Sequence, residues 1–532
     1  MMRHSHRAAE QPLFRVAHYL LFGLTVLLYA FLLQKNGLEV GPDSTIYVRG
    51  ALNLHGGEGY TMGRYFINHF PIGLSLIYAV FMKLVPVTIF QAALILHIIW
   101  IALCALLFNA LLKSSGIQQP VRLLGMGLLL FSSPFLTMSS KLMTELPATL
   151  ILLACTWLFV QYRQHVRFRF VVLGIGILLG VGLLLRFAML GFIGAFALLM
   201  LWQAKRHWKV GLVNAMLVAL PGMMMMLGYT AIVSRVYGAK SVNRVLLWHP
   251  ISGENLLGFF REPLSWLIPI SNGTSPLNVL IILLVVSLGV YLVKSSQKQT
   301  RVSLTMWQRM VHNEWFRIIA IITGTYCLFL VVSISLFDAA TSVDIRILGP
   351  LSIYFYWGIA LLFQRVYSTG KNPRWTYMGL FVLGILFSNA FPFLAKEIYS
   401  QPKAFSTPYW KEDAPNIIND TSGVWLKPKR TIYTNAVAFW LMCNDKRVFP
   451  LPQEKQEVQG RVNLVFEQEI SELLNKVRHD SAQVVYFYNI PSDEPRDNTV
   501  YLRQHVRDST GLLFVPMKAG MIIRAKVARG ED

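Results

Sequence analysis

At 532 residues the chain exceeds one ordinary globular core, and 54% of its residues are hydrophobic while only 14% are charged. This composition excludes a soluble enzyme and indicates a polytopic membrane protein. In a soluble chain, the net charge of +22 would favour a nucleic-acid partner. The basic residues here lie largely in short loops between apolar segments, so we expect no nucleic-acid partner. Four cysteines, mostly within apolar segments, support neither a disulfide framework nor a Cys-rich zinc site.

Apolar segments long enough to cross a bilayer recur along the first 400 residues, since a span needs about 20 mostly apolar residues. The first has no small-residue cleavage site, so we expect it to be retained as a helix. The segment 72–85 is shorter and lies between two prolines, which favours a helix in the membrane interface. We therefore predict a membrane domain over 1–400, a first external loop over 35–86, and about eleven spans near 13–34, 87–112, 121–138, 145–162, 169–186, 187–204, 210–233, 277–294, 316–337, 346–364 and 375–395.

Basic and acidic residues separate between alternate gaps of this pattern. Lysine and arginine precede the first span and fill every second gap after it, among them Lys113, Arg163 and Arg365. Because cytoplasmic loops carry the excess of basic residues, we expect the N-terminus in the cytoplasm and the C-terminal region outside the inner (plasma) membrane. The outward gaps hold the acids Asp43, Glu58, Glu145, Glu254, Glu262, Asp338 and Asp344.

The first external loop begins with a carboxylate next to a helix stop. The sequence Gly41-Pro42 ends the first span, because proline disfavours the helical conformation of the residue before it. We expect Asp43 to occupy the N-cap of a following amphipathic helix whose apolar side rests on the membrane surface, with Tyr47 and Arg49 as interfacial groups. A helix cap alone is the alternative role for Asp43.

From about residue 401 the composition becomes that of a small soluble domain. The β-branched and aromatic segments 431–435 and 482–488 predict strands, and 465–477 has the apolar spacing of a helix. Residues 512–517 and 521–527 predict a hairpin. We therefore expect a small extracytoplasmic α/β domain over 401–532.

Ionisable residues at membrane level are costly and so mark candidate sites. Carboxylates and guanidinium groups gathered at one interface suit deprotonation of a hydroxyl and binding of a phosphate. These candidates all lie at predicted outward helix ends, and they are Asp43, His69, Glu145, Arg186, Asp344 and Arg346.

Each candidate has a structural alternative. Glu145 at a helix start is stabilised by the helix dipole whatever its function, and Asp344 with Arg346 can form an interfacial ion pair or a cap. His69 can be a surface group rather than a metal ligand. Arg186 lies at the tight turn that divides 169–204 into two helices, and its side chain can extend to the lipid headgroups.

The motifs resemble those of GT-C membrane glycosyltransferases, in particular bacterial relatives of protein O-mannosyltransferases and the lipid A aminoarabinose transferase. The first external loop carries Asp43-Ser-Thr-Ile-Tyr47, Leu54-His-Gly-Gly-Glu-Gly-Tyr60 and His69-Phe-Pro-Ile-Gly73, and Met143-Thr-Glu-Leu-Pro147 is similar to a second acidic motif of that family. Asp344-Ile-Arg-Ile-Leu-Gly-Pro350 resembles its Arg-Tyr-x-x-Pro type motif, with Ile347 in place of the tyrosine.

The resemblance implies transfer of a sugar from a polyprenyl-phosphate donor to an acceptor at the outer face of the membrane, with inversion at the anomeric centre. It implies Asp43 as general base with Glu145 as a second catalytic carboxylate, and Arg186 and Arg346 as groups that stabilise the departing phosphate. We assign substrate binding also to Tyr47, Tyr60, His69, Lys141 and Asp344. No cofactor is expected other than a possible divalent metal ion held by Asp43, His69 and Glu145.

Several alternatives stay open at this point. The sugar is not specified, and the acceptor hydroxyl can belong to a lipid, a glycan or a protein. A lipid-linked-sugar transporter or flippase would instead place its site near the bilayer midplane between repeated halves, and the sequence has no such repeat. A non-catalytic scaffold of cell-envelope assembly would explain the topology but not the gathering of acids on one side.

Overall fold

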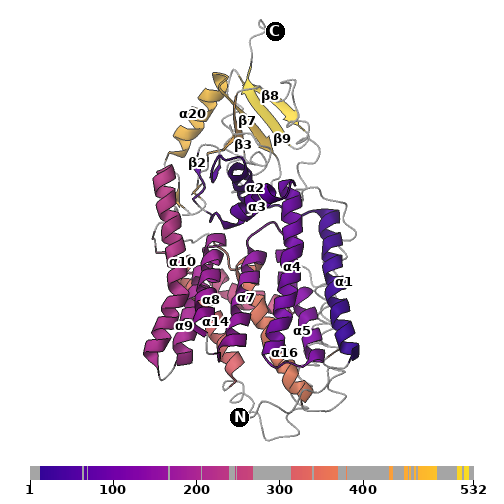
Figure 1. Ribbon diagram of the computed structural model, residues 1–532. Helices are drawn as coiled ribbons and strands as arrows, with labels where there is room; N and C mark the ends of the chain where they lie inside the picture. Colours follow the sequence, from indigo (N-terminus) through magenta and orange to yellow (C-terminus); the bar gives the residue numbers. More distant parts are fainter. Residues whose placement is uncertain are drawn as a thin grey trace.

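The computed structural model shows a helical bundle capped by a small sheet (Figure 1). It describes residues 12–62, 65–68, 70–165, 168–204, 207–238, 246, 248–267, 313–337, 341–368, 379, 430–434, 448–452, 455–456, 461–462, 465–487, 512–517 and 520–526. In Figure 1 the long helices stand side by side, the helices of the first external loop lie above them, and the sheet lies above that loop.

Among the described residues, seven helical segments are long and apolar enough to cross a membrane, or up to eight if one bent pair is a single span. The bent pair is α5 Gln119–Leu130 with α6 Ser133–Ser140, whose axes differ by 53°. Two expected spans, 277–294 and 375–395, lie outside the described residues apart from residue 379, so the total of eleven stays a prediction. The helices are α1 Pro12–Asn36, α2 Pro42–His55, α3 Gly73–Leu84, α4 Ile89–Ser114, α5 Gln119–Leu130, α6 Ser133–Ser140, α7 Glu145–Tyr162, α8 Phe168–Leu185, α9 Met189–Ala204, α10 Trp208–Tyr237, α11 Gly253–Ser265, α14 Glu314–Leu336, α15 Ile345–Leu348 and α16 Ser352–Ser368, with the 3-10 turn η1 Gly349–Leu351 between the last two.

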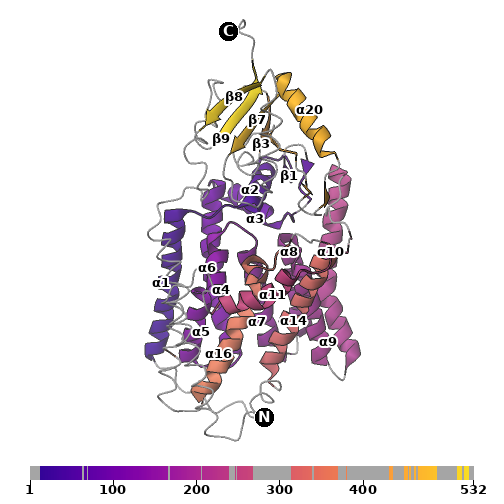
Figure 2. The same cartoon turned by 180° about the vertical axis from the view of Figure 1, so that it is seen from behind.

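Polar contacts join several helix ends at the end of the bundle that carries the basic gaps. Arg163, just after α7, pairs with Glu314 at the start of α14 and lies 4.3 Å from the ring centroid of Trp315. Ser114 at the end of α4 donates to the Gln161 side chain at 2.7 Å. The first external loop, with α2 and α3, lies at the opposite end of the bundle (Figure 2).

The first external loop folds into two helices, α2 and α3, joined by the short antiparallel strands β1 Thr61–Met62 and β2 Tyr65–Phe66. The expected helix over 72–85 is present as α3, and it is too short to be a span. The N-cap prediction for Asp43 is wrong, because Pro42 is the first helical residue and Gly41 is the cap, so Asp43 lies in the first turn. The interfacial placement of Tyr47 and Arg49 is wrong as well: both are buried, because α2 packs on α3.

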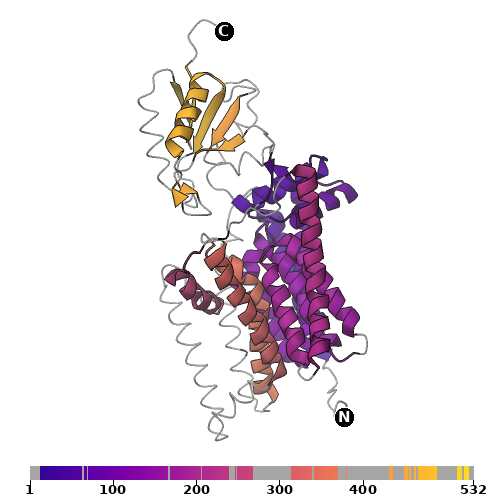
Figure 3. The same cartoon turned by 90° about the vertical axis from the view of Figure 1, so that its left-hand side faces the viewer.

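The C-terminal residues form the expected α/β layer with its own hydrophobic core (Figure 3). The strands β3 Thr431–Thr434, β4 Val448–Pro450 and β7 Ala482–Phe487 are parallel, and β9 Gly520–Ala525 is antiparallel to both β7 and β8 Leu512–Met517, giving the order β4-β3-β7-β9-β8. Apolar residues of α20 Phe466–Arg478 contribute to the same core as those of β7 and β9. A further pair, β5 Lys455–Gln456 and β6 Arg461–Val462, is separate from this sheet. The expected boundary near residue 400 lies outside the described residues.

Candidate active site

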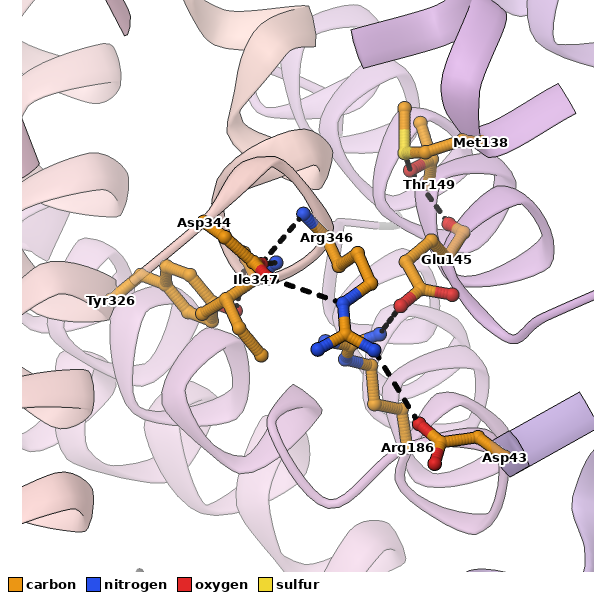
Figure 4. Close-up of polar contacts among 9 residues, drawn as sticks. All are labelled: Asp43, Met138, Glu145, Thr149, Arg186, Tyr326, Asp344, Arg346 and Ile347. Atoms are coloured by element: carbon orange, nitrogen blue, oxygen red, sulfur yellow. Dashed lines mark hydrogen bonds and ion pairs between the residues drawn. The ribbon is translucent and has the colours of Figure 1, made fainter. Parts of the chain in front are cut away.

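Four segments far apart in the sequence bring carboxylates and guanidinium groups together (Figure 4). They are the first turn of α2, the start of α7, the turn between α8 and α9, and the start of α15. The side chains that meet there are Asp43, Glu145, Arg186, Asp344 and Arg346, all of them predicted from the sequence.

Glu145 and Arg186 form a buried ion pair. Glu145 is the first residue of α7, and Arg186 Nη1 lies 2.5 Å from its Oε1, with only 4% and 14% of the two side chains exposed. Burial lowers the pKa of Arg186, but the Glu145 carboxylate more than offsets this effect and raises it, so the guanidinium stays charged. Arg186 therefore turns into the protein instead of extending to the lipid headgroups.

Arg346 lies between two carboxylates. Its Nε donates to Asp344 Oδ2 at 3.1 Å, and its Nη1 lies 3.7 Å from Asp43 Oδ2. Asp344 is also the N-cap of α15, since its Oδ1 accepts hydrogen bonds from the backbone N–H groups of Arg346 and Ile347 at 2.9 and 3.1 Å. The cap and the ion pair expected as structural alternatives for Asp344 are thus both present, and together they orient the guanidinium of Arg346.

Tyr47 connects α2 to the buried ion pair. It is 4% exposed, its hydroxyl hydrogen-bonds to the side chain of Thr144, and Glu145 and Asp43 are among its electrostatic neighbours. Burial raises the pKa of Tyr47 well above its usual range, with Glu145 contributing in the same direction, so the hydroxyl stays protonated. Tyr47 therefore supports the cluster from within the protein.

The other expected substrate-binding residues take different positions. Lys141 Nζ pairs with Glu39 Oε1 at 3.4 Å, and the backbones of these two residues form an isolated β-bridge. Tyr60 is 1% exposed and donates within the first external loop, to the carbonyls of Phe70 and Pro71 at 3.3 and 3.2 Å. His69 lies outside the described residues.

The end of α10 supports the first external loop from the side. The Tyr237 hydroxyl accepts a hydrogen bond from the backbone N–H of Tyr60 at 3.2 Å, and its ring centroid lies 4.7 Å from that of Phe66. Gly59, with φ of 81°, lies directly against this hydroxyl, where an added Cβ would clash. An added Cβ on Gly73, the first residue of α3, would lie 2.5 Å from the carbonyl oxygen of Leu184. The start of α3 therefore packs tightly against the end of α8, where Leu184 lies two residues before Arg186.

The sequence reasoning missed Tyr326. This residue of α14 is buried, donates to the Ile347 carbonyl at 3.0 Å, stacks on Phe192 with centroids 4.2 Å apart, and is an electrostatic neighbour of Arg186. The only signal in the sequence is a tyrosine in the middle of an apolar span, which does not distinguish it from ordinary core aromatics.

The metal site considered above stays a prediction, because His69 lies outside the described side chains. Among them, no group of three or more His, Cys, Asp or Glu residues gathers closely enough to hold a metal ion. The carboxylates of Asp43 and Glu145 pair with the guanidinium groups of Arg346 and Arg186, respectively.

Comparison with solved structures identifies the class of fold as that of the GT-C membrane glycosyltransferases, so the resemblance expected from the motifs is confirmed at the level of the fold. ArnT from Cupriavidus metallidurans, bound to undecaprenyl phosphate, superposes with a TM-score of 0.55 at 13% sequence identity over 97% of this chain and 99% of that one. The oligosaccharyltransferase of Archaeoglobus fulgidus, tethered to an acceptor peptide, superposes with a TM-score of 0.51 at 11% identity over 96% of this chain and 74% of that one. No protein-family model and no curated protein sequence matches the chain.

Proposed function

We propose that the protein transfers a sugar from a polyprenyl-phosphate donor to an acceptor hydroxyl at the outer face of the inner membrane. The observation that carries this proposal is the pairing of Asp43 with Arg346 at 3.7 Å, with 36% and 42% of the two side chains exposed. A carboxylate can accept the proton of a hydroxyl, and a guanidinium fork can bind phosphate oxygens bidentately. A fold shared with a protein solved with undecaprenyl phosphate supports a lipid-linked donor.

The reaction is a single displacement at the anomeric carbon. Asp43 takes the proton of the acceptor hydroxyl as its oxygen forms the new glycosidic bond. The bond from the anomeric carbon to the phosphate oxygen breaks, and the electron pair leaves with the polyprenyl phosphate. Arg346 is the better exposed of the two arginines and stabilises the charge on the departing phosphate. Attack opposite the leaving group inverts the anomeric centre.

Glu145 and Arg186 contribute differently from the roles that the resemblance implied. Because their side chains are paired and almost fully buried, we propose that they fix the start of α7 against the turn between α8 and α9. Arg186 also adds positive potential near the phosphate, since it stays charged. Asp43 therefore takes the proton directly, since its carboxylate is partly exposed and an acceptor hydroxyl can reach it.

The proposed orientation places the cluster and the C-terminal domain outside the cytoplasm. It rests on the separation of basic and acidic residues between the two ends of the bundle. A reporter that is active only outside the cytoplasm, fused after Asp532, is expected to be active, and one fused within the gap around Arg163 is expected to be silent. The reverse pattern would overturn the orientation and the proposed site together.

A lipid-linked-sugar flippase is the second candidate, and the products of the reaction separate the two. Protein reconstituted in vesicles with a polyprenyl-phosphate donor labelled in its sugar is offered lipids, glycans and proteins of the cell envelope as separate acceptor pools. A transferase is expected to release free polyprenyl phosphate and to place the label in one of the pools. Movement of intact donor across the bilayer, without free carrier in any pool, would contradict the proposed function.

A further inference from the structure

The helix α11 has no role in the site described so far, although it lies beside the segment that carries Asp344 and Arg346 (Figures 2 and 3). Ser252 caps this helix, since its hydroxyl accepts from the backbone N–H of Asn255 at 3.1 Å. The segment is tied at both ends: His249 N–H donates to the Ser335 carbonyl at the end of α14 at 2.7 Å, and the Trp266 carbonyl accepts from the Tyr356 hydroxyl of α16 at 3.0 Å. The helix is therefore fixed to the two elements that flank Arg346.

The side chain of Asn255 binds the backbone just before the Asp344 cap. Its amide nitrogen donates to the Thr341 carbonyl at 3.3 Å, and its amide oxygen accepts from the Val343 N–H at 3.0 Å. An amide donates and accepts at once, so it holds segment 341–343 by two hydrogen bonds. Two hydrogen bonds thereby fix the residues that set the direction of Asp344.

The packing around Asn255 leaves this segment little freedom. A Cβ on Gly258, one turn further along α11, would lie 2.6 Å from the Val343 carbonyl oxygen and 3.0 Å from its Cβ. Glu262, one turn beyond that, faces the same region: burial raises the pKa of its carboxyl, and the Asp344 carboxylate adds to this rise against the lowering effect of Arg261. Successive turns of α11 thus contact or face the segment that ends in Asp344.

We propose that Asn255 is a positioning residue of the donor-phosphate site, which holds segment 341–343 so that Asp344 directs Arg346 toward Asp43. This inference rests on the proposed function. Asn255 touches none of the reacting atoms and acts through the cap and ion pair of Asp344. Loss of its two hydrogen bonds lets Arg346 turn away from the position in which it meets a phosphate.

The test measures binding of polyprenyl phosphate and turnover of the sugar donor by the full-length protein in vesicles. Asn255→Ala is expected to weaken polyprenyl-phosphate binding and to raise the donor KM about tenfold, the effect of losing roughly 1.4 kcal/mol, with kcat changed less. Asn255→Asp can still accept from Val343 N–H but cannot donate to Thr341, so its effect is expected to be intermediate. Glu254→Ala, an exposed change on the same turn of α11, is the control and is expected to bind as the parent does.

A double-variant cycle with Arg346→Lys separates positioning from a general loss of structure. Arg346→Lys removes the bidentate fork and is expected to weaken donor binding by itself. If Asn255 acts through Arg346, adding Asn255→Ala to that variant has much less effect than in the parent. The inference would be overturned if the effects of the two substitutions on polyprenyl-phosphate binding were fully additive, or if Asn255→Ala bound it as the parent does. If Asn255→Ala does not fold, Asn255→Asp is used in the same cycle. Failure of the parent itself to bind polyprenyl phosphate would instead count against the proposed function.

Discussion

Asp43→Asn is expected to leave a folded protein that binds the donor and transfers sugar about 10² to 10⁴ times more slowly than the parent, because a lost general base has an effect of this size. Asparagine has nearly the shape of aspartate, and the favourable charge of Asp43 in the first turn of α2 is worth about 0.3–1 kcal/mol, so the free energy of unfolding changes little. Turnover under saturating donor and thermal unfolding are measured on the same preparation.

Glu39→Gln is the control for this variant. It removes a carboxylate of the same external loop that pairs with Lys141 rather than with the arginine cluster, and near-parent turnover is expected. Parent-like turnover by Asp43→Asn would show that Asp43 is not the base. Glu145 would then be the next carboxylate to test, although Arg186 engages it.

Arg186→Met is expected to lower the free energy of unfolding by about 3–5 kcal/mol, because it leaves the carboxylate of Glu145 buried without its counter-ion. The double variant Glu145→Gln with Arg186→Met removes both charges and is expected to regain most of that stability. Unfolding in detergent, followed for the parent, the single variant and the double variant, gives the comparison.

Lys141→Met provides the matched control, since it breaks an ion pair whose side chains are 27% and 48% exposed. Such a pair contributes about 0–1 kcal/mol, so only a small change is expected. An Arg186→Met protein as stable as the parent would show that the buried pair is not needed to hold α7 to the turn between α8 and α9. Recovery of sugar transfer in the double variant would also contradict the proposed electrostatic contribution of Arg186.

Hydropathy and the start and stop signals of helices were sufficient to predict much of the fold. The apolar segments in the described residues form helices where they were expected, although 121–138 is bent by 53° between α5 and α6 and α9 is shorter than a span. Arg186 does mark the turn between α8 and α9. The expected strands and helix of the C-terminal layer are present because their alternation and spacing are local properties of the sequence. Local patterns of this kind do not require knowledge of which elements pack together.

One of the errors came from packing between separate segments, and the others were local. The amphipathic pattern of α2 was attributed to a membrane surface, but its partner is α3, which explains why Tyr47 and Arg49 are buried. Proline suits the first helical position, so α2 begins at Pro42 and its N-cap is Gly41 rather than Asp43. α11 was not predicted, since a helix of 13 residues gives no signal as a span, although Ser252 before its first turn is a usable capping signal.

The candidate site was predictable as a set of residues but not as a geometry. Helix ends on one side of the membrane supplied Asp43, Glu145, Arg186, Asp344 and Arg346. Which carboxylate faces which arginine depends on the packing of α2, α7, α8 and α15, and no local pattern contains that information. Tyr326 was missed for the same reason, because its importance lies only in its neighbours.

Because α10 is long, we expect the distance of the first external loop from the bilayer to depend on the lipids around the protein. Its 30 residues extend about 45 Å, whereas the hydrocarbon core of a bilayer is about 30 Å thick. Tyr237 at the end of this helix contacts Tyr60 and Phe66, so α10, which has Pro221 in its interior, acts as a strut between the membrane and the loop that carries Asp43. A thicker or thinner bilayer changes the tilt of such a strut through hydrophobic mismatch, and the loop moves with it. We therefore expect acyl-chain length to act on the position of the first external loop relative to the bilayer.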